Sequence, residues 1–186
     1  MPHDPIELHT PRLTLLAHTP EQVLALIEQP ERFEELVALT PAAELRGFYV
    51  SGDVSPQWLA ALRSSAGQGP DPWRYGFWII EKSSGEIIGG AGFKGAPDAA
   101  GMVEIAYGVV PSREGQGYAT EAARALIHFA TSDRRVRLLR AHTRPAANAS
   151  TRVLTKCGFV RVADVVDPED GPVWRWERNA HHIGTP

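Results

Sequence analysis

Residues 111–122, PSREGQGYATEA, follow an apolar run, MVEIAYGVV, and place two glycines between an expected strand and an expected helix. Gly115 and Gly117 allow the backbone to approach a ligand closely or to adopt a positive φ. The unpaired N–H groups and the dipole at the start of the following helix favour an anion. This turn is therefore a candidate phosphate site, and the rest of the chain must decide between ligands.

Three phosphate ligands compete for the turn. A P-loop needs Lys followed by Ser or Thr after its last glycine, but Tyr118 and Ala119 follow Gly117. A dinucleotide fingerprint needs a third glycine where this chain has Thr120. Because neither pattern fits, the pyrophosphate of coenzyme A is the third candidate.

Glu104 is the candidate general base because it interrupts an apolar strand. Alternation divides this strand into one face with Val103, Ile105, Tyr107 and Val109 and another with Met102, Glu104, Ala106 and Gly108. Burial of a carboxylate there is costly and would raise its pKa. The alternative is a carboxylate that is paired with an arginine or exposed near an edge. His142, in a later expected strand, is either a rival base or a hydrogen-bonded structural histidine.

Composition bounds the class of protein. The chain has 186 residues, 43% hydrophobic and 22% charged, which predicts one globular domain. A net charge of -3 argues against a nucleic-acid or anionic-membrane partner. Cys157 is the only cysteine, so no disulfide framework or cysteine-built zinc site is expected, and we expect no metal. No secretion signal or membrane-spanning stretch is visible, which predicts a cytoplasmic protein.

Periodicity predicts alternating strands and helices. Strands are expected at 11–16, 74–82, 86–95, 102–110, 135–143, 159–166 and 172–178. Helices are expected after Thr19-Pro20, after Ser55-Pro56, after the glycine turn and at 148–157. Ser83-Ser84-Gly85 is a hairpin signal between two strands. This order is typical of an α/β fold with a mixed sheet.

The run VEIAYGVVPSREGQGYATEAARALIHFA, residues 103–130, resembles the signature strand, turn and helix of the GNAT acetyltransferase superfamily. The family turn, Gln/Arg-x-x-Gly-x-Gly/Ala, maps onto Ser112, Gly115 and Gly117, with serine replacing the family's Gln or Arg. TPRLTL, GEIIGGAGFKG and NASTRVLTKCGFV resemble the branch that acetylates ribosomal-protein N-termini. These motifs occur in order and cover Thr10 to Glu177.

The resemblance implies a mixed, mostly antiparallel twisted sheet, splayed in the middle, with helices on both faces. It implies a single acetyltransferase domain over residues 1–186, with acceptor-side helices at 18–65 and an acetyl-CoA-binding core at 75–178. A bulge past Gly108 would separate this strand from residues 135–143. The protein could form a homodimer, and the sequence does not decide its oligomeric state.

The resemblance also implies direct acetyl transfer from acetyl-CoA to a primary amine, without a covalent enzyme intermediate. The pantetheine arm would pair with the backbone of Val109 and Val110. The phosphates would lie on Arg113, Glu114, Gly115, Gln116, Gly117, Tyr118, Ala119 and Thr120. Asn148 would contact the cofactor, one residue beyond the family's usual position. Ser150 would be the general acid, unless its hydroxyl caps the helix.

Several alternatives remain open at the level of the sequence. The acceptor amine could belong to a polyamine, an antibiotic or a protein N-terminus. A non-catalytic acyl-CoA-binding module would share the turn but would not need Glu104. Tryptophans could line a substrate cleft, although packing in the core or at its rim is the default for Trp58, Trp73, Trp78, Trp174 and Trp176.

Overall fold

The computed structural model of the chain describes residues 5–51 and 55–181. Its strands are β1 (Glu7–His9), β2 (Leu13–Ala17), β3 (Phe77–Glu81), β4 (Ile87–Phe93), β5 (Met102–Val109), β6 (Leu138–Thr143), β7 (Val160–Asp167) and β8 (Gly171–Asn179). Its helices are α1 (Pro20–Glu28), α2 (Pro30–Val37), α3 (Leu45–Val50), α4 (Pro56–Ser64), α5 (Tyr118–Ser132) and α6 (Ala149–Lys156), with a short 3-10 helix, η1 (Pro111–Arg113), before α5.

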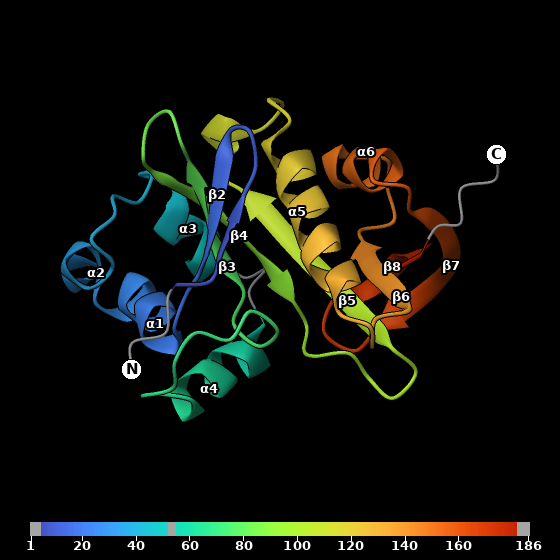
Figure 1. Ribbon diagram of the computed structural model, residues 1–186, viewed down its shortest axis with the longest axis horizontal. Coiled ribbons are helices and arrows are strands. Elements are labelled where there is room, and N and C mark those ends of the chain that lie inside the picture. The colour runs from blue at the N-terminus through green and yellow to red at the C-terminus, as the bar shows by residue number, and fades with distance from the viewer. Residues whose placement is uncertain (1–4, 52–54, 182–186) are drawn as a thin grey trace.

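The strands of the described residues form one eight-stranded sheet in the order β1-β2-β3-β4-β5-β6-β8-β7 (Figure 1). Neighbouring strands are antiparallel except β5 and β6, which are parallel. The expected mixed, mostly antiparallel sheet is confirmed. Its single parallel pair lies in the middle, where β1–β5 meet β6–β8.

Helices cover both faces of the sheet, as expected (Figure 1). On one face, Phe129 of α5 packs edge-on against Phe77 of β3. The next residue, Trp78, points to the opposite face, where its ring meets Phe33 of α2 and Tyr49 of α3. Alternation along β3 therefore divides the core into one layer beneath α5 and another beneath α2 and α3.

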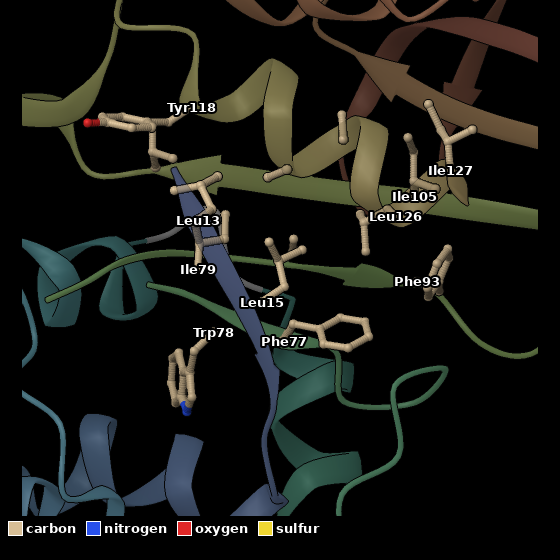
Figure 2. Close-up of a cluster of buried hydrophobic side chains, with 14 of the residues drawn as sticks. Leu13, Leu15, Phe77, Trp78, Ile79, Phe93, Ile105, Tyr118, Leu126 and Ile127 are labelled. Carbon is tan, nitrogen blue, oxygen red and sulfur yellow. The ribbon is translucent and has the colours of Figure 1, made fainter. Parts of the chain in front are cut away.

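The helix that follows the glycine turn, α5, buries one apolar stripe against the sheet. Figure 2 shows Ile105 of β5 between Ile127 and Leu126 of this helix, with Phe93 of β4 beyond Leu126. The predicted stripe is confirmed, since the buried residues of α5 are Tyr118, Ala122, Ala123, Leu126, Ile127 and Ala130. The small alanine side chains let the helix pack closely on the strands, which holds its first turn at the end of β5.

Two helix starts follow the predicted capping signals. The Thr19 hydroxyl accepts a hydrogen bond from the Gln22 N–H at 3.3 Å, and the Gln22 amide oxygen accepts one from the Thr19 N–H at 3.0 Å. The Ser55 hydroxyl accepts from the Trp58 N–H at 3.2 Å. The pair at Thr19 is reciprocal and the bond at Ser55 is single, and both satisfy N–H groups that the start of a helix leaves unpaired.

Three elements were not predicted: β1, α2 and α3. β1 has only three residues and α3 only six, which is too short for a clear periodic pattern. Each of the two helices is held by large buried side chains, Phe33 in α2 and Leu45 in α3, both fully buried. Tertiary packing, which a local pattern does not show, therefore determines them.

A buried histidine lies in the layer beneath α2 and α3. His18 is 2% exposed, and its ring centroid lies 4.5 Å from that of Trp78. Within the described residues, neither His18 Nδ1 nor Trp78 Nε1 has a hydrogen-bond partner. Burial lowers the pKa of His18 to about 3, so its ring is neutral at physiological pH.

This burial predicts a pH dependence of stability. Because the pKa of His18 lies below its ordinary value of 6.5, the unfolded chain binds a proton that the folded chain excludes. The free energy of unfolding should therefore fall as the pH drops below about 6.5, by about 2 kcal/mol at about pH 5. Urea unfolding at pH 5 and 7.5 measures this loss. A His18→Phe variant, which keeps a ring against Trp78, should show a correspondingly smaller loss; an equal loss in both proteins would contradict this assignment.

Candidate active site

The glycine turn links β5 to α5 through η1. Gly115 and Gly117 both have positive φ, 72° and 85°. Gly117 is the N-cap residue of α5, and no side chain caps this end of the helix. A Cβ at Gly117 would lie 3.2 Å from Nη2 of Arg12, whereas one at Gly115 would meet nothing within 4 Å. Both positions therefore favour glycine because of their positive φ. At Gly117 a side chain would also crowd the guanidinium of Arg12.

The first turn of α5 presents unpaired backbone donors. The first backbone hydrogen bond of the helix runs from the Glu121 N–H to the Gly117 carbonyl at 3.1 Å. Among the described residues, no acceptor is recorded for the N–H groups of Tyr118, Ala119 and Thr120. These donors and the helix dipole favour an anion, and anion binding at this end of α5 stays a prediction.

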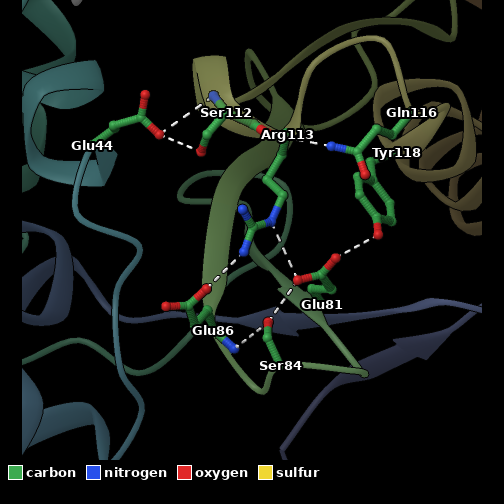
Figure 3. A network of polar contacts seen from close by, with 8 residues as sticks. All are labelled: Glu44, Glu81, Ser84, Glu86, Ser112, Arg113, Gln116 and Tyr118. Carbon is green, nitrogen blue, oxygen red and sulfur yellow. Dashed lines mark hydrogen bonds and ion pairs between the residues drawn. The ribbon is translucent and has the colours of Figure 1, made fainter.

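Two side chains of the predicted phosphate site instead anchor the turn to the β3–β4 hairpin (Figure 3). Arg113 pairs with Glu81 at 3.3 Å and with Glu86 at 2.9 Å. The Tyr118 hydroxyl donates to Glu81, which also accepts from the Ser84 hydroxyl at 2.6 Å. Hydrogen bonds from Ser84 and Tyr118, with the nearby Arg113 guanidinium, lower the pKa of Glu81. Arg113 and Tyr118 can thus contribute to the phosphate site through their backbone.

Two further contacts fix the turn from other sides. The Ser112 hydroxyl and N–H both donate to the carboxylate of Glu44, next to α3 (Figure 3). Arg12, beside β2, donates from Nη1 to the Gln116 carbonyl at 2.9 Å and from Nε to Glu121 at 2.8 Å. The turn is therefore tied to three separate elements before any ligand binds.

The sheet opens between β5 and β6. Their parallel pairing covers only Met102–Glu104 against Leu138–Arg140. Beyond that point β5 stays paired with β4 as far as Val109, and β6 stays paired with β8 as far as Thr143. We expected a bulge past Gly108, and this was wrong. The β4–β5 register is continuous, so β5 has no bulge there. The strands separate instead because β6 follows β8 away from β5, directly after Glu104.

Alternation along β5 identifies the backbone groups that face this opening. The Val110 N–H donates to the Ile88 carbonyl at 2.8 Å, and the Glu104 carbonyl accepts from the Lys94 N–H at 2.9 Å. In an antiparallel ladder, every second residue directs both its N–H and C=O toward the same neighbour. The N–H and C=O groups of Ile105, Tyr107 and Val109 therefore point toward the opening. Val110, predicted as a second pairing position, has its N–H occupied within the sheet.

Glu104 lies at the point where the strands separate. Its side chain is 15% exposed, and Oε1 lies 2.8 Å from Lys94 Nζ and 2.9 Å from His142 Nδ1. Burial raises the pKa of Glu104, but the hydrogen bonds and charges of His142 and Lys94 outweigh it, and the net shift is downward. The predicted rise in pKa was wrong because the sequence does not show this pairing. Both contacts use the same carboxylate oxygen.

The structure joins the two candidate bases in one network. His142 Nδ1 contacts Glu104, and His142 Nε2 lies 3.4 Å from Nε of Arg175. A carboxylate on Nδ1 fixes the orientation of the imidazole ring. Glu104 and His142 therefore form one hydrogen-bonded pair that lines the opening.

Ser150 and Tyr107 meet across the opening. Ser150 is the second residue of α6, and its Oγ lies 3.4 Å from the Tyr107 hydroxyl. Burial raises the pKa of Tyr107 to about 12, so the phenol is protonated at neutral pH. Tyr107 was not predicted as a functional residue, because alternation placed it on the same face as the apolar residues Val103, Ile105 and Val109. Nothing in the local sequence reports its contact with α6.

Asn148, and not Ser150, caps α6. Its Oδ1 accepts from the Thr151 N–H at 3.0 Å, and the Thr151 hydroxyl accepts from the Asn148 N–H at 3.0 Å. This reciprocal cap leaves the Ser150 hydroxyl facing Tyr107. Because Oδ1 of Asn148 is used in the cap, a cofactor contact from this residue would come from its amide nitrogen.

Two cavities meet at β5. The gap cavity, about 710 Å³, is lined by Lys94, Glu104–Tyr107, Ala141–Pro145, Ser150, Glu169, Asp170, Pro172 and Val173. The helix-side cavity, about 690 Å³, lies against α3, α4 and β4. The two share Lys94, Ala106, Tyr107, Glu169 and Asp170. A molecule in each cavity could therefore meet the other beside Tyr107.

A third hollow, of about 880 Å³, runs from the glycine turn along the outer side of α5. It includes Gly117 and Thr120 and continues past Arg124 and Lys156. None of its lining residues belongs to β5. This hollow therefore extends from the start of α5 and does not reach the opening beside β5.

Within residues 5–51 and 55–181, no group of three or more His, Cys, Asp or Glu side chains is arranged to hold a metal ion. Over those same ranges, no helix has both the length and the apolar character needed to cross a membrane.

A central parallel pair that opens beside an uncapped helix, with a cavity on each side, defines the class of fold. A family model described as "Acetyltransferase (GNAT) domain" matches residues 12–160. The chain belongs to the GNAT acetyltransferase family.

The chain is similar to "Uncharacterized N-acetyltransferase YjdG" of Bacillus subtilis (strain 168), with 35% identity over 99 residues. This alignment covers 53% of the chain and 56% of that protein, so the chain spans about half the length of this relative. Among solved structures, Mycobacterium smegmatis RimJ in complex with CoA-disulfide has a TM-score of 0.62 and 20% identity, covering 99% of this chain and 90% of that one.

A ribosomal-protein-S5-alanine acetyltransferase from Vibrio fischeri has a TM-score of 0.63 and 12% identity, covering 97% of this chain and 100% of that one. At such identities these two likenesses show the fold alone. The predicted α/β fold with a splayed sheet and helices on both faces therefore agrees with that of ribosomal-protein acetyltransferases.

Proposed function

We propose that the protein is an acetyl-CoA-dependent N-acetyltransferase that transfers an acetyl group directly to a primary amine. One observation carries this proposal: the open edge of β5 leads directly into the uncapped first turn of α5. An extended arm with amide groups and a terminal pyrophosphate matches that order of donors and acceptors. Coenzyme A has this chemistry.

The pantetheine arm would lie in the gap cavity as an added strand. Its amides would pair with the inward-facing backbone groups of Ile105, Tyr107 and Val109. The pyrophosphate would accept hydrogen bonds from the first-turn N–H groups of α5, beside Gly117. The 3′-phosphorylated nucleotide would extend toward Arg124 and Lys156, whose charges favour a phosphate. Both line the hollow that begins at the turn.

Glu104 would receive the proton of the acceptor ammonium, directly or through one water. An ammonium has no lone pair, so the amine must lose a proton before its nitrogen attacks the thioester carbon. An α-amino group has a pKa of about 8 and a lysine side chain about 10.4, so an α-ammonium gives up its proton to the base more readily. The lowered pKa of Glu104 keeps its carboxylate ionised at neutral pH but also makes it a weaker base, so the transfer favours an amine of low pKa. His142 and Lys94 hold Oε1 and leave Oε2 for the transfer.

Tyr107 would donate the proton that the departing thiolate takes up. The nitrogen–carbon bond would form, the attacking nitrogen would release its second proton to solvent, and the carbon–sulfur bond would break so that coenzyme A leaves as the free thiol. The Tyr107 backbone faces the same opening in which the thioester would lie. Ser150, 3.4 Å from the phenol, would position it and return its proton from solvent. The thioester oxygen would accept from a backbone N–H of β5 as negative charge develops.

The base assignment predicts the behaviour of a Glu104→Gln variant. Its kcat should fall by about a hundredfold or more, the usual contribution of a general base, while its Kd for acetyl-CoA stays unchanged. Transfer is measured as release of CoA thiol across a panel of primary amines. Glu177→Gln is the matched control, because Glu177 pairs with Arg140 at 2.7 Å in the same sheet but does not line the gap cavity. Equal turnover in both variants would remove Glu104 from this role.

The acid assignment predicts different effects for Tyr107→Phe and Ser150→Ala. Tyr107→Phe should lower kcat by about tenfold, a modest loss because a thiolate with a pKa of about 8.5 leaves readily. Ser150→Ala should lower kcat less, because it would act through the phenol. Steady-state kinetics at saturating acetyl-CoA separate the two variants. A larger loss in Ser150→Ala, with Tyr107→Phe active, would assign the acid to Ser150.

A further inference from the structure

The helix-side cavity is built from aromatic rings. Its lining includes the aromatic residues Phe48, Tyr49, Trp58 and Tyr75. Phe93 and Tyr107 also line it, but the Phe93 ring packs against Phe129 of α5 and the Tyr107 hydroxyl lies against Ser150 of α6. Tyr49 and Trp58 lie near-parallel, with ring centroids 6.2 Å apart and planes at 23°. Phe48 meets Tyr49 edge-on at 5.3 Å. At about 690 Å³ the cavity has the size of a typical small-molecule site.

Two glycines of the sheet make room for these rings. Gly90 of β4 and Gly108 of β5 are direct cross-strand partners. A Cβ on Gly90 would lie 2.1 Å from the Tyr49 hydroxyl oxygen, and a Cβ on Gly108 would lie 2.6 Å from Cζ of Phe48. A side chain at either position would have to displace the ring of Tyr49 or Phe48. The close seating of Phe48 and Tyr49 on β4 and β5 is therefore a specific feature of this cavity.

The charged residues of the helix-side cavity lie in two places. Glu169, Asp170 and Lys94 line the part shared with the gap cavity, and Arg74 lies outside that part. Among the described lining residues, the carboxylates are Glu169 and Asp170, which also line the gap cavity. Glu169 is held there by a 2.9 Å hydrogen bond from the Ser55 hydroxyl at the start of α4. The cationic residues of the lining are Arg74 and Lys94. One ammonium group is therefore favoured beside the gap cavity, whereas a second positive charge deeper in the cavity would lie near the guanidinium of Arg74.

We propose that the acceptor is a small monoamine carried on an aromatic body, of the arylalkylamine class. The ring would lie against Phe48 and Trp58, and the amine would reach the junction near Glu169 and Asp170, within range of the thioester. Flat aromatic surfaces favour an aromatic ligand through ring stacking and burial of apolar area. This inference rests on the proposed acetyl transfer and specifies its substrate.

The test compares 2-phenylethylamine with ethylamine, spermidine and a short peptide with a free N-terminal alanine. Acetyl transfer is followed by CoA release, and binding of each amine to the CoA-loaded protein is measured by calorimetry. We expect kcat/KM for 2-phenylethylamine to exceed that for each of the other three by about tenfold or more. Higher kcat/KM for spermidine or the peptide would overturn the arylalkylamine assignment and leave acetyl transfer intact.

Trp58→Ala should lower kcat/KM for 2-phenylethylamine by about tenfold and leave that for ethylamine unchanged. The control is Trp174→Ala, because Trp174 lies on β8 outside the helix-side cavity. If Trp58→Ala does not fold, Ala61→Trp narrows the cavity from α4 and should have the same selective effect.

Binding and turnover have separable outcomes. Binding of 2-phenylethylamine that is lost in Trp58→Ala, without acetylation of any amine, would support the ligand class and contradict the proposed function. Acetylation of other amines without binding of 2-phenylethylamine would contradict the ligand class alone. Neither binding nor acetylation of any amine would overturn both.

Discussion

The structure depends on one constraint, which is that backbone N–H and C=O groups inside a protein need partners. In the middle of the sheet some of these groups have no partner strand. There β5 separates from β6 after Glu104, and the edge of β5 that faces β6 stays unpaired as far as Val109. The first turn of α5 continues the same row with further unpaired donors. A ligand that supplies the missing partners would complete the sheet, so the binding site arises from the fold itself.

An open edge is useful only if its surroundings hold it open. β6 is kept away by its full pairing with β8, and the glycine turn is tied down by Arg113, Ser112 and Arg12. Much of the polar chemistry near the turn is therefore structural. The side chains that we propose for the reaction lie further along the opening, where the pairs Glu104–His142 and Tyr107–Ser150 line the same gap cavity. In this arrangement cofactor binding would depend on the backbone, and proton transfer on side chains.

Local signals in the sequence were enough to predict the main elements. Capping residues such as Thr19, the glycine turn and the apolar stripe of α5 act over a few residues, and each is found where expected. Contacts between distant segments could not be predicted. The pairing of Glu104 with Lys94 and His142 reverses the expected direction of its pKa shift. Likewise, the opening comes from β6 following β8, a long-range preference that no motif within β5 reports.

The central claim is that acetyl-CoA completes the open edge of β5 and the first turn of α5. Amide hydrogen exchange, followed by mass spectrometry with and without acetyl-CoA, tests it most directly. The account predicts that protection increases most in peptides covering residues 105–110 and 118–121, with little change in β7. No added protection in those two segments at millimolar acetyl-CoA, or protection confined to other parts of the chain, would contradict it.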